Sequence, residues 1–159
     1  MTLITKTALF YSSSASKSAE ETFLCLNGLL IFDEGNLDDT SDDRCRVLNS
    51  SNSNLPTNET NCITVDLDGD VWVGTNEGII IFECGGSAFE SNCDGSLRIV
   101  ERDNFNELLF KTQTVQAIAV DGANRKWVGT TNGAYLISPD GEEEILHFTD
   151  SNSPLFDNN

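Results

Sequence analysis

Short apolar runs separated by turn residues dominate the chain. Between residues 61 and 103 the runs NCITVDL, VWVGT, GIIIF and SLRIVERD follow one another, with Asp-Gly-Asp and Asn-Glu-Gly between the first three. The first and last runs alternate polar and apolar residues, as half-buried strands do, while GIIIF is continuously apolar, as a fully buried strand is. Glycine-containing two- and three-residue spacers favour hairpin turns between such runs. The pattern therefore predicts four short antiparallel strands.

Two other parts of the chain repeat this arrangement. Residues 114–150 contain TVQAIAVD, KWVGT, AYLIS and EEILHFTD, with Thr-Asn-Gly and Asp-Gly at the turns. Residues 5–49 contain TKTALFYS, TFLCL, LLIFD and CRVLN, with Asn-Gly joining the second and third runs. Helical periodicity is absent, although NFNELLFKTQ at 104–113 could hold one helical turn. We therefore expect an all-β fold.

The second and third units are copies of one motif. Residues 62–82 align with residues 117–137 at a constant offset of 55 without gaps. A fainter first copy exists, because NGLLIF at 27–32 matches EGIIIF at 77–82. Internal repeats of this length are typical of stacked arrays and propellers. The identical pairs are Ile63/Ile118, Val65/Val120, Asp66/Asp121, Trp72/Trp127, Val73/Val128, Gly74/Gly129, Thr75/Thr130 and Gly78/Gly133.

A unit of four antiparallel strands that repeats every ~45 to 55 residues is typical of a β-propeller, in which each unit forms one blade. We expect about three four-stranded blades: a degenerate first blade at 1–54, a second at 55–109 and a third at 110–152. Residues 153–159 resemble the start of a further blade connector, because SPLFDNN echoes SNLPTNE at 53–59. Since propellers typically have about four to eight blades, the prediction is a fragment of a larger ring.

The identical residues have structural roles in this interpretation. The tryptophan of each copy is expected to pack its indole between neighbouring sheets. The glycine two residues later would permit close backbone approach, and the glycine of the following turn would supply a positive φ. The predicted structural residues are Trp72, Gly74, Thr75, Gly78, Trp127, Gly129, Thr130 and Gly133.

The charge balance excludes some classes of partner. The chain carries 26 acidic residues against 9 lysines and arginines, for a net charge of −17. Such a surface repels phosphate backbones and anionic lipid headgroups, so we expect no nucleic-acid partner. No stretch approaches the roughly 20 apolar residues of a membrane helix, so no membrane insertion is expected. The N-terminus lacks a basic segment followed by a long apolar core, so we expect a signal peptide to be absent from this chain.

Cysteine usage argues for an oxidising compartment. None of the cysteines forms a Cys-x-x-Cys pair, and His147 is the only histidine, so zinc is poorly supported. Cys84 and Cys93 bracket CGGSAFESNC, a loop that could close as a disulfide, and Cys25 and Cys45 flank a comparable acidic loop. Two bridges with one cysteine left over leave the pairing open, and some cysteines could instead be small buried residues. An extracytoplasmic location is the favoured reading.

An acidic turn in the second unit has the spacing of a calcium loop. Asp66, Asp68 and Asp70 alternate, and Glu77 stands where such a loop places its last carboxylate. Against this, the position that needs a turn-forming glycine is Val71. The copy of this turn in the third unit, DGANRK, carries an arginine and a lysine instead of carboxylates.

We therefore prefer to interpret Asp66 and its repeat partner Asp121 as caps of a strand turn, with side chains bonding backbone N–H groups.

Catalytic chemistry has little support. His147 lies in EEILHFTD without a partner sequence that suggests a triad, and an edge-strand surface histidine is the better interpretation. The many carboxylates make chance acid pairs inevitable, so none is assigned to acid–base catalysis. The Gly-Gly-Ser at 85–87 lacks the lysine and the strand–helix context of a phosphate loop. No catalytic residue and no cofactor is predicted.

The two clear copies, each preceded by a segment like NLP or SPL, resemble the two-component regulator propeller repeat. The family pattern is an apolar strand, Asp, a short turn with Gly, Trp-aliphatic-Gly-Thr, then Gly and an apolar strand; NCITVDLDGDVWVGTNEGIIIF and TVQAIAVDGANRKWVGTTNGAYLI follow it. The first copy departs from it, with TFLCL in place of the Trp-Val-Gly-Thr strand. Related propellers form periplasmic sensor regions of hybrid histidine kinases and parts of type IX secretion-associated proteins. The repeat carries no catalytic residue.

This resemblance implies a non-enzymatic ligand-recognition or scaffold segment of an extracytoplasmic propeller. Loops on a rigid scaffold commonly bind ligands, so residues 33–44 and 84–95 are the candidate contacts for a glycan or protein, beside further blades of a longer chain. The alternative is a propeller-fold lyase or hydrolase whose catalytic residues lie mostly outside this chain. A purely structural part of a secretion or adhesion protein is the third possibility, because a fold does not identify a ligand.

Overall fold

The computed structural model describes residues 9–12, 28–33, 38–84, 88–89, 93–102 and 105–155. Within these residues the chain is all-β, and its helical content is one 3-10 turn, η1 (Thr40–Asp42). All paired strands are antiparallel. The strands are β1 (Leu9–Ser12), β2 (Leu29–Asp33), β3 (Arg44–Leu48), β4 (Thr60–Val65), β5 (Val71–Thr75), β6 (Gly78–Phe82), β7 (Ile99–Arg102), β8 (Phe105–Leu108), β9 (Val115–Val120), β10 (Lys126–Thr130), β11 (Gly133–Ile137) and β12 (Glu144–Phe148).

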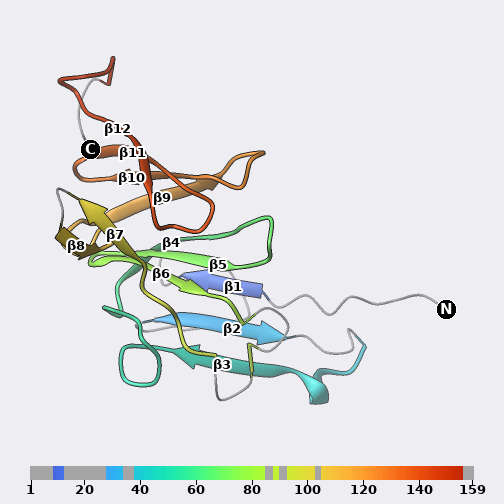
Figure 1. Cartoon of the computed structure of the whole chain (residues 1–159). Coiled ribbons are helices and arrows are strands. Elements are labelled where there is room, and N and C mark those ends of the chain that lie inside the picture. The colour runs from blue at the N-terminus through green and yellow to red at the C-terminus, as the bar shows by residue number, and fades with distance from the viewer. Residues whose placement is uncertain are drawn as a thin grey trace.

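Three small sheets stack in the order of the chain (Figure 1). Sheet β1-β2-β3 lies at the bottom of the view, β4-β5-β6 in the middle and β9–β12 at the top, while the hairpin β7-β8 lies beside β9. Each sheet runs through consecutive neighbouring strands without a crossover. Successive antiparallel meanders stacked face to face are the blades of a β-propeller, and the chain forms a part of one.

The last sheet has the four strands that the sequence pattern predicts. Strands β9 to β12 pair in the order of the chain, and Trp127 in β10 lies opposite Ala119 in β9 and Leu136 in β11. Glycine turns join these strands, and Gly133 between β10 and β11 has a φ of 112°. Because a positive φ is disfavoured for side chains with a Cβ, glycine is the natural residue there. Its counterpart Gly78 has a φ of 101°.

The fourth strand predicted for the middle sheet is wrong over most of its length. Within SLRIVERD, Ser96 alone bridges to β6, opposite Ile81, and the following residues leave to form β7 and pair with β8. The helical turn considered within 104–113 is also replaced, by β8 and a turn in which Phe110 has a φ of 58°. Phe110 is buried, with its ring 4.8 Å from that of Tyr135 in β11. Burial of Phe110 against the next sheet therefore draws this segment away from β6.

The first sheet also differs from its predicted strand order. Strand β1 pairs directly with β2, with Leu9 opposite Phe32 and Ser12 opposite Leu29. The sequence pattern placed TFLCL between these two strands, and that segment lies outside the described residues. Strand β1 thus holds the position beside β2 that β5 holds beside β6.

Two apolar clusters fill the spaces between the three sheets. Alternation along a strand sends neighbouring side chains to opposite faces. Val71 and Val73 accordingly face Leu29 and Ile31 of the first sheet. Trp72 between them faces the last sheet, where its cluster includes Val115, Val128 and Tyr135. This double burial explains why β5 and β6 are apolar at almost every position.

Two of the predicted structural residues behave differently in the last sheet. Trp72 is 1% exposed, as expected of an indole between sheets, but Trp127 is 39% exposed and stacks on Phe148 with ring centroids 5.9 Å apart. A Cβ on Gly74 would lie 2.6 Å from Val115 Cγ1, whereas one on Gly129 would meet nothing closer than Ala117, at 3.8 Å. Within the described residues, the inter-sheet packing expected of Trp127 and the close approach expected of Gly129 are therefore not seen, and both stay predictions.

Candidate functional site

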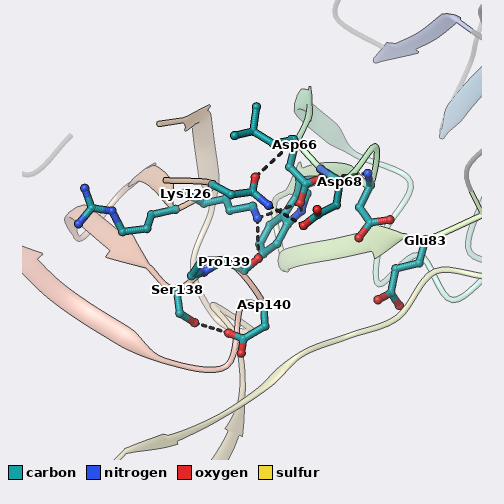
Figure 2. A network of polar contacts seen from close by, with 12 residues as sticks. Asp66, Asp68, Glu83, Lys126, Ser138, Pro139 and Asp140 are labelled. Atoms are coloured by element: carbon teal, nitrogen blue, oxygen red, sulfur yellow. Dashed lines mark hydrogen bonds and ion pairs between the residues drawn. The ribbon is translucent and has the colours of Figure 1, made fainter. Parts of the chain in front are cut away.

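The densest polar site lies between the middle and last sheets and centres on a buried lysine (Figure 2). Lys126, the first residue of β10, is fully buried, and its Nζ lies 2.8 Å from Asp66 Oδ2. The same Nζ donates to the carbonyl oxygen of Pro139 at 2.5 Å and lies 4.4 Å from the ring centroid of Trp72. An ammonium group can be buried only when charge and hydrogen bonds replace its hydration, and these contacts do so.

Asp66 lies in the turn between β4 and β5 of the middle sheet, and both of its carboxylate oxygens have hydrogen-bond partners. Its Oδ1 accepts hydrogen bonds from the backbone N–H groups of Asp68 and Asp70, both at 3.0 Å. Its Oδ2 accepts from Trp72 Nε1 at 3.0 Å, in addition to the contact with Lys126. The turn between β4 and β5 therefore holds the carboxylate in place for the lysine. In the last sheet, Asp121 Oδ1 likewise accepts from the N–H groups of Ala123 and Arg125, which confirms the predicted capping role of both aspartates.

The pKa of Asp66 reflects this enclosure. Burial by itself would raise the pKa, but the hydrogen bonds from Lys126, the Asp70 backbone and Trp72, together with the lysine's charge, hold it below its ordinary value. Asp70 shows the opposite. Burial raises its pKa, and the nearby negative charges of Asp66, Glu83 and Asp68 raise it further. In the acidic turn, Asp66 is therefore stabilised as an anion by Lys126, whereas Asp70 is destabilised as an anion by the neighbouring carboxylates.

A second contact joins the two Asp turns directly. Asn124 Oδ1 accepts a hydrogen bond from the backbone N–H of Leu67 at 2.9 Å, and its Nδ2 donates to Asp68 Oδ2 at 2.7 Å. Asn124 has a φ of 61°, and its repeat counterpart Gly69 also has a positive φ, of 90°. Asparagine tolerates this conformation better than most residues with a Cβ. The third-unit turn can thus keep its shape and still provide a side chain that reaches the second unit.

Arg98 closes the outer side of the site. Its Nη2 lies 2.6 Å from Glu83 Oε1, its Nε donates to the carbonyl oxygen of Asp140 at 2.9 Å, and its Nη1 donates to Ser96 Oγ at 3.0 Å. The hydrogen bond from Arg98 is the main reason that the pKa of Glu83 is lowered. Arg98 therefore bridges the middle sheet and the loop between β11 and β12, the loop of Ser138, Pro139 and Asp140 in Figure 2.

These groups join the middle and last sheets through an ion pair and hydrogen bonds. Within the described residues no group of three or more histidine, cysteine or acidic side chains is placed to hold a metal ion. A calcium ion at Asp66 would have to displace Lys126, and Asp68 is engaged with Asn124. Asp66 and Lys126, the strongest acid–base candidates by type, are enclosed and bonded to each other.

Sequence reasoning missed Lys126. In the sequence it stands out only as a positive charge at a position where a calcium loop needs a carboxylate. The available signal was its place in the repeat, because position 126 corresponds to Val71, a buried apolar residue of the other copy. A lysine at an apolar repeat position predicts a buried partner, but the identity of that partner depends on how the copies stack.

The loop after β6 is closed by a disulfide between Cys84 and Cys93. Cys93 and Ala88 are buried in the cluster between the first and middle sheets. From β3, Arg46 Nη1 donates to the carbonyl oxygen of Ala88 at 3.0 Å, and the Arg44 guanidinium lies 4.5 Å above the ring of Phe89. The loop therefore straps the first two sheets together, and its described residues contribute to the core.

The remaining candidate residues lie apart from this site. Cys45 is an exposed thiol and Cys62 a half-buried one, and burial raises the pKa of the Cys62 thiol. Cys25 lies outside the described residues. His147 lies in β12, an edge strand of its sheet, and stacks on Tyr135 with ring centroids 3.9 Å apart.

An open depression lies beside the end of the predicted 84–95 contact loop. It has a volume of about 540 Å³ and is bordered by Ser50 and residues 53–55 of the connector between β3 and β4, and by residues 95–97. Asn54 Nδ2 donates to the carbonyl oxygen of Gly95 at 2.8 Å and fixes the two sides together. The serine and asparagine side chains along it are suited to hydrogen bonding with a polar ligand.

Comparison with solved structures gives two informative matches. The chain is similar to PorZ of Porphyromonas gingivalis, an essential bacterial surface component of the type IX secretion system, with 30% identity and a TM-score of 0.71 over 83% of this chain. It is also similar in fold to the extracellular domain of BT3049 from B. thetaiotaomicron, assigned to a hybrid two-component system, with 23% identity and a TM-score of 0.57 over 83% of this chain. The chain spans 19% of the PorZ chain and 15% of the BT3049 chain.

No protein-family model and no curated protein sequence matches the chain. The described residues contain no helix of the length and apolarity that crossing a membrane requires. The structural matches are thus to a surface component of the type IX secretion system and to an extracellular domain assigned to a hybrid two-component system.

Proposed function

We propose that this chain of β-propeller blades is a non-enzymatic ligand-recognition or scaffold segment of an extracytoplasmic propeller of the two-component regulator type, in a sensor or secretion-associated protein. The observation that carries the proposal is the similarity to PorZ, which is 30% identical over 83% of this chain. The likeness to BT3049 supports the fold.

Two features of the site support a binding or scaffold role. The acid–base pair Asp66 and Lys126 is enclosed and serves to hold two sheets together. The open depression between Asn54 and Gly95, in contrast, has polar groups facing solvent on a rigid support. Ligands that match such a surface are glycans or polar protein segments, because both are recognised through hydrogen bonds from side chains and backbone.

The Cys84–Cys93 disulfide supports the extracytoplasmic location, since such bonds persist mainly in oxidising compartments. The test is to alkylate the thiols of the protein in intact cells of its native host before lysis, and to map the label by mass spectrometry. We expect label at the exposed Cys45 and none at Cys84 or Cys93. Label at all three cysteines in the folded protein would place it in a reducing compartment and contradict the proposed location.

The binding role is tested at the depression. Immobilised chain is probed with a glycan array and with the purified surface polysaccharide of the host, and then with the variant Ser50→Trp, which fills the depression. Ser151→Trp is the matched control, since Ser151 is an exposed residue of the equivalent segment after β12. We expect Ser50→Trp to weaken binding by about tenfold or more, because a bulky ring blocks a preformed site, and Ser151→Trp to leave it unchanged. Equal binding by both variants would refute the depression as the ligand site.

A further inference from the structure

The outer strand of the middle sheet is interrupted beside β6. Ser96 N–H donates to the Ile81 carbonyl oxygen at 2.7 Å, and Ile81 N–H donates to the Ser96 carbonyl oxygen at 3.0 Å. In an antiparallel ladder the next residues to exchange such bonds lie two positions further along each strand, which here are Ile79 and Arg98. The Arg98 carbonyl oxygen instead accepts from Leu109 N–H at 2.9 Å. The ladder on β6 therefore ends at Ile81, and the chain turns away into the hairpin β7-β8.

The other two sheets are paired at the corresponding position. Leu29 in β2 and Ala134 in β11 stand at the repeat position of Ile79. Each has a partner in the outer strand of its sheet, Leu48 for the first and Phe148 for the second. Ile79 pairs with β5 on its inner side, and no described residue forms a backbone hydrogen bond with its outer side. Because Ile79 is 2% exposed, its outer N–H and C=O are shielded from bulk water, where unpaired groups are costly.

A small apolar pocket occupies the interruption. Its volume is about 210 Å³, and it is lined mainly by Pro56, Ile79, Leu97, Leu108 and Leu109, with Glu77 and Lys111 completing its border. Leu97 packs against the core cluster between the first and middle sheets, whereas Ile79 and Leu109 belong to the cluster between the middle and last sheets. Since residues from both faces of the middle sheet meet here, the pocket lies in the plane of that sheet, beyond the edge of β6.

The pocket adjoins the open depression of the candidate site. Leu97 borders both, and the connector between β3 and β4 passes along both, with residues 53–55 at the depression and Pro56 at the pocket. A ligand that follows this connector meets polar groups at the depression and apolar groups at the pocket. Glycans carry hydroxyl groups on most of their carbons, and burial of a hydroxyl without a partner is unfavourable. The apolar pocket therefore favours a peptide over a glycan.

We propose that the pocket and the depression together bind an extended peptide segment that carries one large aliphatic or aromatic side chain. The proposal rests on the binding role proposed for the depression. The apolar side chain fills the pocket, whose volume of about 210 Å³ is below the range of about 300 to 1,000 Å³ typical of sites for drug-sized ligands. The backbone of the same residue completes the interrupted ladder at Ile79. In such strand addition, main-chain hydrogen bonds give affinity and side-chain pockets give specificity.

Two blocked amino acids test the pocket by itself. N-acetyl-leucine N-methylamide and N-acetyl-serine N-methylamide are each added at millimolar concentration to the isotope-labelled 159-residue chain, and backbone amide shifts are followed by NMR. Both probes are uncharged, so the net charge of −17 does not bias the comparison. The leucine probe is expected to shift the amide signals of Ile79, Leu97 and Leu108 until they saturate, and the serine probe to leave them unchanged. Equal shifts with both probes, or no shift at Ile79 with either, would mean that the pocket does not select an apolar side chain and would overturn the proposal.

The substitution Leu108→Trp tests the pocket from the side of the protein. Leu108 is half-buried at the end of β8, and the larger ring is expected to weaken binding of the leucine probe by about tenfold or more, because it fills a preformed site. Leu155→Trp makes the same change at an exposed position and is expected to leave binding unchanged. Equal binding by the two variants would contradict the pocket as the site. If Leu108→Trp does not fold, the comparison of the two probes on the unsubstituted chain decides the question.

A short peptide tests whether the pocket and the depression act together. Acetyl-Ser-Ser-Leu-Ser-Ser-amide has its leucine at the centre, so either chain direction can place serines along the depression. It is expected to bind at least about tenfold more tightly than the leucine probe, since linked contacts reinforce one another. Ser50→Trp, which fills the depression, is expected to remove this gain and to leave binding of the leucine probe unchanged. A gain that survives Ser50→Trp would refute the joint site.

The failure of this proposal is distinguishable from the failure of the proposed function. If the leucine probe does not affect Ile79 while Ser50→Trp still blocks the host polysaccharide, the depression is a glycan site and the peptide proposal is wrong. If neither the peptide nor the polysaccharide responds to Ser50→Trp, the binding role of the depression is wrong, and the joint site with it.

Discussion

At the scale of single residues, the repeat uses the same aspartate for two purposes. Asp66 and Asp121 both cap their turns through Oδ1. Their Oδ2 atoms differ, because Asp66 reaches a buried lysine of another sheet and Asp121 reaches the partly exposed Arg125 of its own turn. An ion pair inside a protein gives little net stability over an apolar replacement, but removal of one member leaves the other charge buried without a partner.

The first prediction follows from this contrast. Asp66→Asn is expected to lower the free energy of unfolding by about 3 to 5 kcal/mol, since it leaves the buried Lys126 ammonium without its counterion. Asp121→Asn is the matched control and is expected to have a much smaller effect, because surface ion pairs contribute little. Urea unfolding of the two variants measures the difference. Equal losses would show that the ion pair with Lys126 adds nothing to the role of Asp66, since Asn can retain the capping in both turns.

The difference should also depend on pH. The folded-state pKa of Asp66 lies below its ordinary value of 3.8, so its stabilising contribution is complete above that pH and is lost as the pH falls through the folded-state pKa. The gap between wild type and Asp66→Asn should therefore shrink below about pH 4. A gap that stays constant down to acid unfolding would contradict the ionic origin of the effect.

Asp70 gives a prediction of opposite sign. Burial and the charges of Asp66, Glu83 and Asp68 raise its pKa, so its ionised form is disfavoured in the folded protein. At pH 7 we expect Asp70→Asn to raise the free energy of unfolding, by about 0.5 kcal/mol. The gain should vanish as the pH falls through the raised pKa towards the ordinary value of 3.8, because Asp70 then becomes neutral in wild type as well.

Thermal melts at several pH values measure this gain. Asp94→Asn is the control for removing one negative charge at an exposed position. If Asp70→Asn and Asp94→Asn raise the melting temperature equally, the lower net charge explains the gain, and local repulsion at Asp70 does not.

At the scale of the elements, one strand motif packs differently in its two copies. VWVGT in β5 is buried on both faces, whereas KWVGT in β10 is covered on one. The threonine of each strand has the same task in both copies: Thr75 Oγ1 donates to the carbonyl oxygen of Gly78 at 2.9 Å and Thr130 Oγ1 to that of Gly133 at 3.1 Å. The hairpin turn is thus a local property of the motif, while the environment of its tryptophan and first glycine depends on the neighbouring sheet.

Alanine at the two glycines measures that dependence. Gly74→Ala is expected to lower the free energy of unfolding of the 159-residue chain by about 1 to 3 kcal/mol, because its Cβ would overlap Val115 Cγ1 and Cys62 Sγ. Gly129→Ala in the same chain should change it by less than about 0.5 kcal/mol, since the nearest atom would be 3.8 Å from the Cβ. Chemical denaturation compares the variants. Equal effects would indicate that intrinsic strand preference, rather than contact with the next sheet, sets the requirement for glycine.

The strands themselves were largely predictable, with errors at the sheet edges. The apolar and alternating runs and the glycine turns predicted β4 to β6 and β9 to β12 correctly, because each of these strands pairs with its neighbour in the chain across a short connection. The prediction failed at 96–110, where the apolar residues Leu109 and Phe110 bury against another sheet. An apolar run in the sequence favours burial but does not identify the neighbour against which it packs, and strands at the edge of a sheet have the most alternatives.

At the scale of the whole molecule, repulsion among the excess carboxylates destabilises the folded state. The net charge of −17 is spread over a small β-structure whose two inter-sheet clusters are its main cohesive force. Lys126 and Arg98 place positive charge where the middle and last sheets meet, which offsets part of the repulsion between the acidic turns. Water and counterions screen the remaining repulsion between carboxylates.

Salt should therefore stabilise the chain. Raising sodium chloride from about 50 mM to about 500 mM shortens the screening length and weakens repulsion among the exposed carboxylates, and we expect the melting temperature to rise by several degrees. Differential scanning calorimetry measures the shift, and a parallel series with guanidinium chloride at low concentration separates screening from denaturation. A fall in melting temperature with sodium chloride would mean that the exposed ion pairs, such as Arg125 with Asp121, outweigh the general repulsion.

The sequence by itself determined the all-β class, the repeat, the turn glycines and the turn-capping aspartates, because each of these depends on residues within one short segment. Only the tertiary structure decided that Trp72 is enclosed and Trp127 exposed, that Lys126 pairs with Asp66, and that residues 99–108 form a separate hairpin. The two copies of the motif have different surroundings, because the last sheet covers Trp72 whereas the described residues leave Trp127 39% exposed. Local sequence fixes what a strand can bury, and the order of stacking fixes where it does so.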